Sequence, residues 1–255
     1  MMFSDKNIAV QLYTVRDLLE KDFAGTLKAV ADLGFQNVEF AGFGDRTAAE
    51  VRRVTSDLGL QIIGGHVPID GFRQDLRQTM DYFTELGCPN MVLGWVAEEH
   101  RVGSAGWKNL ARTLDQAGRT AHARGLSVSY HNHSFEFEKF DGACGLDIFY
   151  SEASADYVWA ELDTYWLQHG NVDPADYIRR YGERCHLLHL KDMAAGPERT
   201  YTEVGAGILK WPEILSAAAE GSVEYLIIEH DNPRISPLES IRISRDNLRQ
   251  LLMLA

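Results

Sequence analysis

The chain has 255 residues, 45% of them hydrophobic, and a net charge of −12 at pH 7. This length fits a single eight-fold β/α barrel, and the hydrophobic fraction is sufficient for a large core. The acidic charge argues against nucleic acid and against an anionic membrane as partners. Three widely spaced cysteines form no CxxC pair, which argues against a disulfide framework or a thiolate zinc site.

Neither a signal peptide nor a membrane span is predicted. The first residues lack the charged-then-apolar pattern of a signal peptide. No apolar stretch approaches the roughly 20 residues that cross a bilayer. We therefore expect a cytoplasmic protein.

Short apolar segments typical of β-strands alternate with helical segments along the whole chain. The predicted strands are residues 8–12, 37–40, 61–66, 90–95, 127–131, 157–162, 186–190 and 225–229. A capping box at Thr47 and Glu50 marks one helix start. Four glycines end helical segments just before a strand: Gly34, Gly59, Gly87 and Gly125. Strict alternation with eight strands predicts a parallel sheet closed into a (β/α)8 TIM barrel, a single domain over residues 1–255.

The polar phase of each strand predicts which side chains enter the barrel lumen. Alternate side chains share a face, and the apolar face packs against the helices. The inward set is Gln11, Tyr13, Glu39, His131, His133, Glu161, Asp163, His189, Lys191, Glu229 and Asp231. The phase of His66 is undecided. The outward residues His186, Asp192 and His230 are predicted to be structural, and His100, His122 and His169 to face solvent.

The C-terminal ends of parallel barrel strands meet at one mouth, so these acids and imidazoles are expected to converge there. Burying several carboxylates together without a cation is unfavourable, because like charges and desolvation both oppose their ionisation. Carboxylates and imidazoles are also the usual ligands of divalent metals. The sequence therefore predicts a metal site at the mouth.

Six motifs, in order along nearly the whole chain, resemble the sugar phosphate isomerase/epimerase branch of the xylose-isomerase-like barrels. They are QLYTVR at 11–16, YHNH at 130–133, ELDT at 161–164, HLKD at 189–192, VGAG at 204–207 and IEHD at 228–231. The resemblance implies one divalent ion, often Mn²⁺ but also Co²⁺, Mg²⁺ or Zn²⁺. Its implied ligands are Glu136, Asp163, His189 and Glu229. Relatives usually carry Glu where this chain has His131, so His131 or His133 is an alternative to Glu136.

The resemblance also implies an isomerase or epimerase that acts on a ketose or related polyol through a metal-stabilised enediolate. Glu136 and Glu229 are the predicted acid/base pair, with His131 and His133 as alternatives and Lys191 as a cationic donor. The predicted substrate-binding residues are Gln11, Glu39, His66, Glu161, Trp166 and Asp231. Phe43, Trp95 and Trp166 are candidates for stacking on a sugar ring.

Two other functions are open at this point. A metal-dependent lyase or dehydratase of a keto-sugar or keto-inositol is one, and the imidazoles of His131 and His133 lean towards it because an extra acid helps a leaving oxygen depart. A non-catalytic or endonuclease-type barrel is the other, and the acidic charge argues against the endonuclease. The predicted partner is a small sugar or polyol, and a homo-oligomer is compatible with the family.

Overall fold

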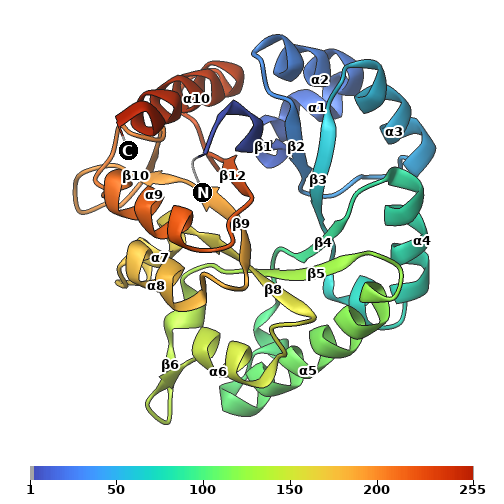
Figure 1. Ribbon diagram of the computed structural model, residues 1–255, viewed down its shortest axis with the longest axis vertical. Helices are drawn as coiled ribbons and strands as arrows, with labels where there is room; N and C mark the ends of the chain where they lie inside the picture. The colour runs from blue at the N-terminus through green and yellow to red at the C-terminus, as the bar shows by residue number, and fades with distance from the viewer. Residues whose placement is uncertain (1–2, 255) are drawn as a thin grey trace.

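A computed structural model describes residues 3–254 and confirms the barrel. Its strands follow the closed order β1-β12-β9-β8-β5-β4-β3-β2, and every pair of neighbouring strands in the barrel is parallel. The barrel strands are β1 (Ile8–Gln11), β2 (Asn37–Phe40), β3 (Gln61–His66), β4 (Asn90–Leu93), β5 (Ser127–His131), β8 (Val158–Asp163), β9 (Cys185–Leu190) and β12 (Tyr225–Ile228). Figure 1 shows β1 beside β12, where the two ends of the sheet meet.

Each predicted strand is present, with small differences at the ends. β1 stops at Gln11 because a 3-10 helix, η2 (Leu12–Val15), follows it directly. The Gln11 side chain accepts a hydrogen bond from the Tyr13 amide at 3.1 Å and so caps this turn. β4 stops at Leu93, two residues before Trp95. Tyr13 therefore lies in η2 and Trp95 in the loop after β4, and both line the mouth.

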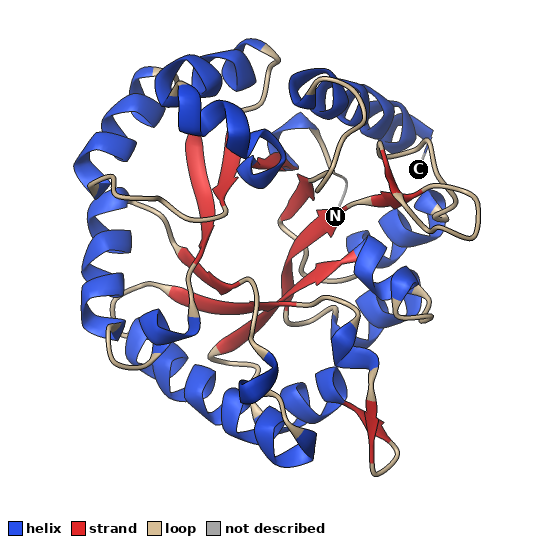
Figure 2. Ribbon diagram, turned by 180° about the vertical axis from the view of Figure 1, so that it is seen from behind, coloured by secondary structure: helices blue, strands red, loops and turns tan. Residues whose placement is uncertain are grey.

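The helices form an outer ring around the barrel (Figure 2). They are α1 (Arg16–Lys21), α2 (Phe23–Asp32), α3 (Ala48–Asp57), α4 (Leu76–Leu86), α5 (Gly103–His122), α6 (Gly145–Glu152), α7 (Thr164–His169), α8 (Pro174–Tyr181), α9 (Trp211–Glu220) and α10 (Pro237–Leu254). The predicted capping box at Thr47 and Glu50 is present at the start of α3. The four glycines predicted at helix ends have φ from +67° to +87°, the left-handed conformation of helix C-caps.

Two hydrophobic layers hold the barrel. The larger lies between the sheet and the helices. The smaller fills the lower lumen with one side chain from each of five strands: Ala9, Ile63, Val92, Leu187 and Ile227. This apolar layer separates the C-terminal end of the lumen, where the predicted site residues lie, from the opposite end, where Gln61, Asn90 and Tyr225 line another hollow.

The βα loops after β5 and β9 are longer than the others and contain short hairpins that the sequence pattern did not predict. β6 (Lys139–Phe140) pairs with β7 (Ala143–Cys144), and this hairpin projects from the barrel in Figures 1 and 2. β10 (Asp192–Met193) pairs with β11 (Tyr201–Thr202). Five 3-10 turns complete the described chain: η1 (Asp5–Asn7), η2, η3 (Ile69–Phe72), η4 (Glu98–His100) and η5 (Phe135–Phe137).

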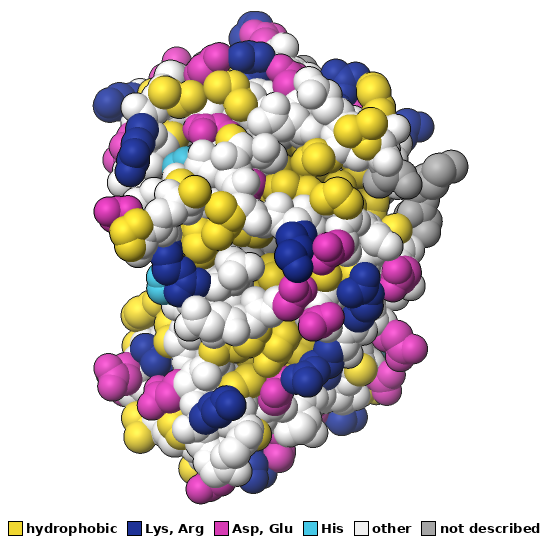
Figure 3. Space-filling model, turned by 90° about the vertical axis from the view of Figure 1, so that its left-hand side faces the viewer, with side chains coloured by type: hydrophobic (Ala, Val, Ile, Leu, Met, Phe, Trp, Pro, Cys, Tyr) yellow, Lys and Arg dark blue, Asp and Glu magenta, His cyan; other side chains and the backbone are white. Residues whose placement is uncertain are grey.

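On the face drawn in Figure 3, basic and acidic side chains are interspersed, with apolar side chains between them. Within residues 3–254, no helix combines the length and apolar character that crossing a membrane would require.

Candidate metal centre and cavity

The mouth of the barrel encloses a cavity of about 520 Å³. Polar side chains from the strand ends line its inner part: His66, His131, His133, Lys191, Glu229 and Asp231. The outer part is lined mainly by residues of the loops that follow β1, β2, β3 and β4. Six of the predicted site residues therefore face one space, contributed by strands far apart in the sequence.

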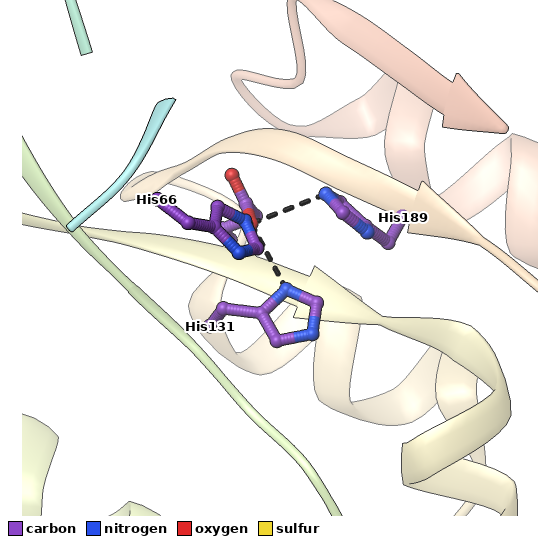
Figure 4. A group of neighbouring side chains, drawn as sticks. His66, His131 and His189 are labelled. Atoms are coloured by element: carbon purple, nitrogen blue, oxygen red, sulfur yellow. Dashed lines mark hydrogen bonds and ion pairs between the residues drawn. The ribbon is translucent and has the colours of Figure 1, made fainter. Parts of the chain in front are cut away.

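Three imidazoles converge on one carboxylate oxygen at the inner end (Figure 4). Glu161 Oε1 lies 2.9 Å from His131 Nδ1, 3.1 Å from His66 Nε2 and 3.1 Å from His189 Nε2. Glu161 is completely buried, whereas His66 and His131 line the cavity. The structure thus settles the undecided phase of β3: His66 points into the lumen.

A second buried carboxylate supports the same imidazoles from the neighbouring strands. Glu39 Oε2 accepts a hydrogen bond from Gln11 Nε2 at 3.0 Å and lies 2.7 Å from His189 Nε2. Gln11, Glu39 and Glu161 are not among the residues lining the cavity. Their contact with substrate stays a prediction. In the structure each of them contacts an imidazole of the cluster: Gln11 contacts His66, Glu39 contacts His189, and Glu161 contacts His131.

Two glycines make room for this cluster. A Cβ on Gly64 would overlap Glu39 Oε1, and a Cβ on Gly94 would overlap the ring of His66. A register shift between β2 and β3 places Glu39 beside Gly64. Small residues on β3 and after β4 are therefore required by the side chains beside them.

A second group of possible ligands lies next to the first and shares His189. Asp163, His189 and Glu229 offer ligand atoms that all lie within 4.8 Å of one another. His189 Nδ1 is 2.8 Å from Glu229 Oε2, on the opposite side of the ring from Glu39. Buried Lys191 holds both carboxylates, with Nζ at 3.2 Å from Asp163 Oδ2 and 2.8 Å from Glu229 Oε2.

His131 supplies a fourth donor to this group. Its Nδ1 is engaged with Glu161, so its other nitrogen, Nε2, is directed at Asp163, with 3.8 Å to Oδ2. Metal-binding histidines usually donate their second ring N–H to a carboxylate in this way, which fixes the tautomer and aims the free nitrogen. His189 has the same arrangement, with Glu39 on Nε2 and Glu229 beside Nδ1.

Unsatisfied oxygens show that these residues fit a cation. Glu39 Oε1 and Glu161 Oε2 are buried without a hydrogen-bond partner, and Asp163 Oδ2 has the Lys191 ammonium 3.2 Å away. Buried carboxylate oxygens without partners are strongly unfavourable, and a divalent ion removes that cost. Two carboxylates and two imidazoles are a donor set that Mn²⁺, Zn²⁺ and Co²⁺ accept.

Glu136, the predicted fifth-strand ligand, lies apart from these groups. Its Oε1 accepts a hydrogen bond from the Tyr130 hydroxyl at 2.8 Å, and its Oε2 accepts one from the His133 amide at 2.9 Å. Both oxygens are thus occupied, and Glu136 is completely buried. Its assignment to the metal stays a prediction. Of the alternatives, His131 is the residue with a free donor atom directed at Asp163.

Burial and charge set different protonation states for the imidazoles. Burial, reinforced by His189, lowers the pKa of His131 to about 3, and burial beside His131 holds the pKa of His133 well below its usual value. Burial also opposes protonation of His66, but hydrogen bonds to Glu161 and Glu39 outweigh it and raise the pKa to about 9. His131 and His133 therefore keep a nitrogen lone pair at neutral pH.

The carboxylates and the lysine are also perturbed. Burial raises the pKa of Asp163 to about 6, against the opposing effect of Lys191. Burial raises the pKa of Glu136 to about 7, although the His133 amide and the Tyr130 hydroxyl favour its charged form. Burial disfavours the charge on Lys191, but Asp163, Glu229 and Asp231 raise its pKa well above the usual value. Such shifts concentrate at functional sites.

The residues assigned to the outward phase have structural contacts. Asp192 accepts hydrogen bonds from the amides of Met193, Gly205, Gly207 and Leu209 and from the Trp211 indole, and so closes the loop after β9. His186 contacts Glu224 and stacks on Trp159, and His230 lies beside Thr14 and Tyr201.

The structure differs from the predicted exposure of two histidines and from the predicted stacking role of two aromatic residues. His122 is exposed as predicted, but His100 and His169 are half-buried, and His100 lines the cavity because η4 folds back over the mouth. Trp166 packs against His133 and Tyr201 and does not line the cavity. Phe43 lines a neighbouring hollow of about 420 Å³. Trp95 lines the main cavity, and strand parity could not show this because Trp95 lies beyond its strand.

The comparisons with known proteins agree with the fold. A family model described as a xylose isomerase-like TIM barrel matches residues 27–251. An inosose dehydratase from Clostridium beijerinckii is 24% identical over 163 residues, which are 56% of this chain and 54% of that protein. The chain spans between half and about three fifths of the length of the curated relatives it matches.

Solved structures resemble the chain over nearly its whole length. A sugar phosphate isomerase/epimerase from Parabacteroides distasonis superposes with a TM-score of 0.85 at 23% identity, covering 97% of this chain and 94% of that one. An L-ribulose 3-epimerase superposes with a TM-score of 0.75 at 18% identity, with the same coverage. At these identities the likeness shows the fold.

Proposed function

Because the chain belongs to the xylose isomerase-like TIM barrel family and carries a fitting set of metal ligands, we propose that it is a divalent-metal-dependent sugar isomerase or epimerase. Its substrate is a ketose or a related polyol. Sugar epimerases among its structural neighbours support this choice.

One observation supports the proposal most strongly: four donors, two carboxylates and two imidazoles, gather at the inner end of one cavity. We assign the ion to His131, Asp163, His189 and Glu229, with Mn²⁺ first among the candidates. Such an ion would polarise a substrate carbonyl as a Lewis acid and so acidify the neighbouring C–H. The partner is a small sugar or polyol, and the cytoplasmic location rests on the sequence.

Residues of the cavity wall can move the proton. Glu229 lines the cavity and contacts His189 and Lys191, which lower its pKa against the effect of burial and so keep the carboxylate ionised. His133 lines the cavity as well, and its Nδ1 is buried with no hydrogen-bond partner. Removal by one group and return by the other is the general acid–base chemistry of an epimerase. Lys191 Nζ contacts Asp163, Glu229 and Asp231, so a substrate oxygen would bind this cationic donor in place of one of them.

A dehydratase or lyase acting on a keto-sugar or keto-inositol is the second candidate. The similarity to an inosose dehydratase favours it, and His133 adds an imidazole to the cavity wall. Both candidates share proton removal next to a carbonyl. They differ in whether the proton returns to carbon or a β-oxygen leaves.

Proton–deuterium exchange tests the proposal. The protein is incubated with Mn²⁺ in D₂O against a panel of ketoses, inososes and 3-keto sugars, and the products are followed by NMR and mass spectrometry. Deuterium uptake with rearrangement supports an isomerase or epimerase, and loss of water or of a substituent supports the second candidate.

A matched pair of variants controls the exchange experiment. Glu229→Gln should abolish exchange, whereas Glu213→Gln, an exposed carboxylate on α9, should keep it. No exchange with any member of the panel, or full exchange in Glu229→Gln, would refute the assignment.

A further inference from the structure

We propose that the substrate carries a second ring with an apolar face, which binds against Trp95 outside the polar end of the cavity. The inference rests on the proposed function in one respect, namely that the polar end of the cavity binds a sugar or polyol, and it adds a second binding surface to that site. The second ring is either an aryl group or the C–H face of another sugar, and both present the same flat apolar surface to an indole.

The cavity changes character from its inner end to its outer end. The inner part has six ionisable side chains and binds hydroxyl and carbonyl groups. The outer wall is built from two neighbouring loops, with Val67, Pro68 and Ile69 after β3 and Trp95 and Ala97 after β4. Among the described residues that line the cavity, His100 is the ionisable side chain near this wall.

Trp95 is 60% exposed, and Tyr13 across the mouth is 40% exposed. Large aromatic side chains at the rim of a polar cavity mark ligand-binding surfaces, because leaving them in water is unfavourable. Trp166, by contrast, is occupied by His133 and Tyr201. Trp95 is in none of the aromatic contacts among the described residues, so its indole face is available to a ligand.

The dimensions of the cavity agree with a two-part ligand. Tyr13 follows β1 and Trp95 follows β4, three strand intervals around the barrel wall. At about 4.8 Å per interval this arc is roughly 14 Å, wider than one ring. A cavity of about 520 Å³ falls within the range that holds drug-sized ligands. A single polyol at the inner end would leave the apolar wall uncovered.

Calorimetric titration with three glucosides tests the second-ring site in the full chain with excess Mn²⁺. Methyl β-glucoside has no second ring, phenyl β-glucoside has an aryl ring, and cellobiose has a second sugar ring. We expect at least one two-ring ligand to bind about tenfold more tightly than the methyl glucoside, which corresponds to about 1.4 kcal/mol. The tighter of the two identifies the chemistry of the second ring.

Variants locate the effect. Trp95→Ala should remove the tenfold advantage, and Trp95→Phe should keep part of it. Ile208→Ala is the control, because Ile208 is 50% exposed and does not line the cavity. Equal affinity for all three ligands, no binding of any of them, or an advantage that survives Trp95→Ala would overturn the inference.

These results are separable from the proposed function. If deuterium exchange fails but the Trp95-dependent advantage is present, the reaction is wrong and the second-ring site stands. If exchange occurs and the three glucosides bind equally, the reaction stands and the second-ring site is wrong.

Discussion

A metal ligand needs a free donor atom, and His131 has one whereas Glu136 does not. His131 has Nε2 free and 3.8 Å from Asp163, whereas both oxygens of Glu136 accept hydrogen bonds. Strand parity predicted that His131 points inward, but it carries no information about residues in the following loop. Tyr130, which donates a hydrogen bond to Glu136, points outward from β5. A sequence pattern does not reveal that a loop carboxylate pairs with an outward-facing strand residue.

The raised pKa of Glu136 predicts a pH-dependent stability. The pKa rises from 4.5 to about 7 on folding, so the folded protein binds the proton more tightly than the unfolded chain. The stability from this group is therefore fully present below pH 4.5 and is lost as the pH rises to about 7. Because a tenfold change in proton affinity is worth about 1.4 kcal/mol, the loss is up to roughly 3 kcal/mol.

Glu136→Gln removes this titration. The free energy of unfolding of the variant should rise relative to wild type between pH 4.5 and pH 8, measured by urea titration with EDTA present. Glu138→Gln, an exposed carboxylate in the same loop, is the control. A constant difference between Glu136→Gln and wild type at all pH values would contradict the assignment.

At the scale of elements, the register between strands places the supporting carboxylates. The shift between β2 and β3 brings Glu39 beside Gly64, and β4 ends so that Gly94 lies against His66. The sequence predicted each strand within two residues, but two consecutive glycines in β3 hid its phase. The inward or outward phase of a strand is recognised from alternating polar and apolar side chains. Gly64 and Gly65 have no side chains, so the pattern could not assign His66 to either face.

The contact between Gly94 and His66 predicts a specific coupling. Gly94→Ala should destabilise the protein by about 1–3 kcal/mol, because the new methyl group overlaps the His66 ring. The three nearest atoms to that methyl group all belong to His66, so the same change in a His66→Ala background should cost little. Urea unfolding of the two single variants and the double variant measures this. Additive costs would show that the His66 ring does not fill this space.

At the scale of the whole molecule, the alternation of strands and helices was enough to predict the barrel. Parity predicted five of the six ionisable side chains at the inner end of the cavity and left His66 undecided. The long loops after β5 and β9 were not predictable in this way, because their hairpins depend on contacts between loops. The division of the cavity into a polar end and an apolar wall likewise required the structure, since Trp95 and residues 67–69 lie outside the strands.

The most direct test of the metal centre is the number of Mn²⁺ ions bound per chain, measured by elemental mass spectrometry after removal of free ions. Wild type should hold one ion. Asp163→Asn should bind Mn²⁺ at least about 100-fold more weakly, because losing even an outer partner of a ligand costs 10–100-fold. Asp246→Asn, at a half-buried aspartate on α10 that pairs with Arg242 and does not line the cavity, should keep the ion. Full occupancy in Asp163→Asn, or no ion in wild type, would contradict the account.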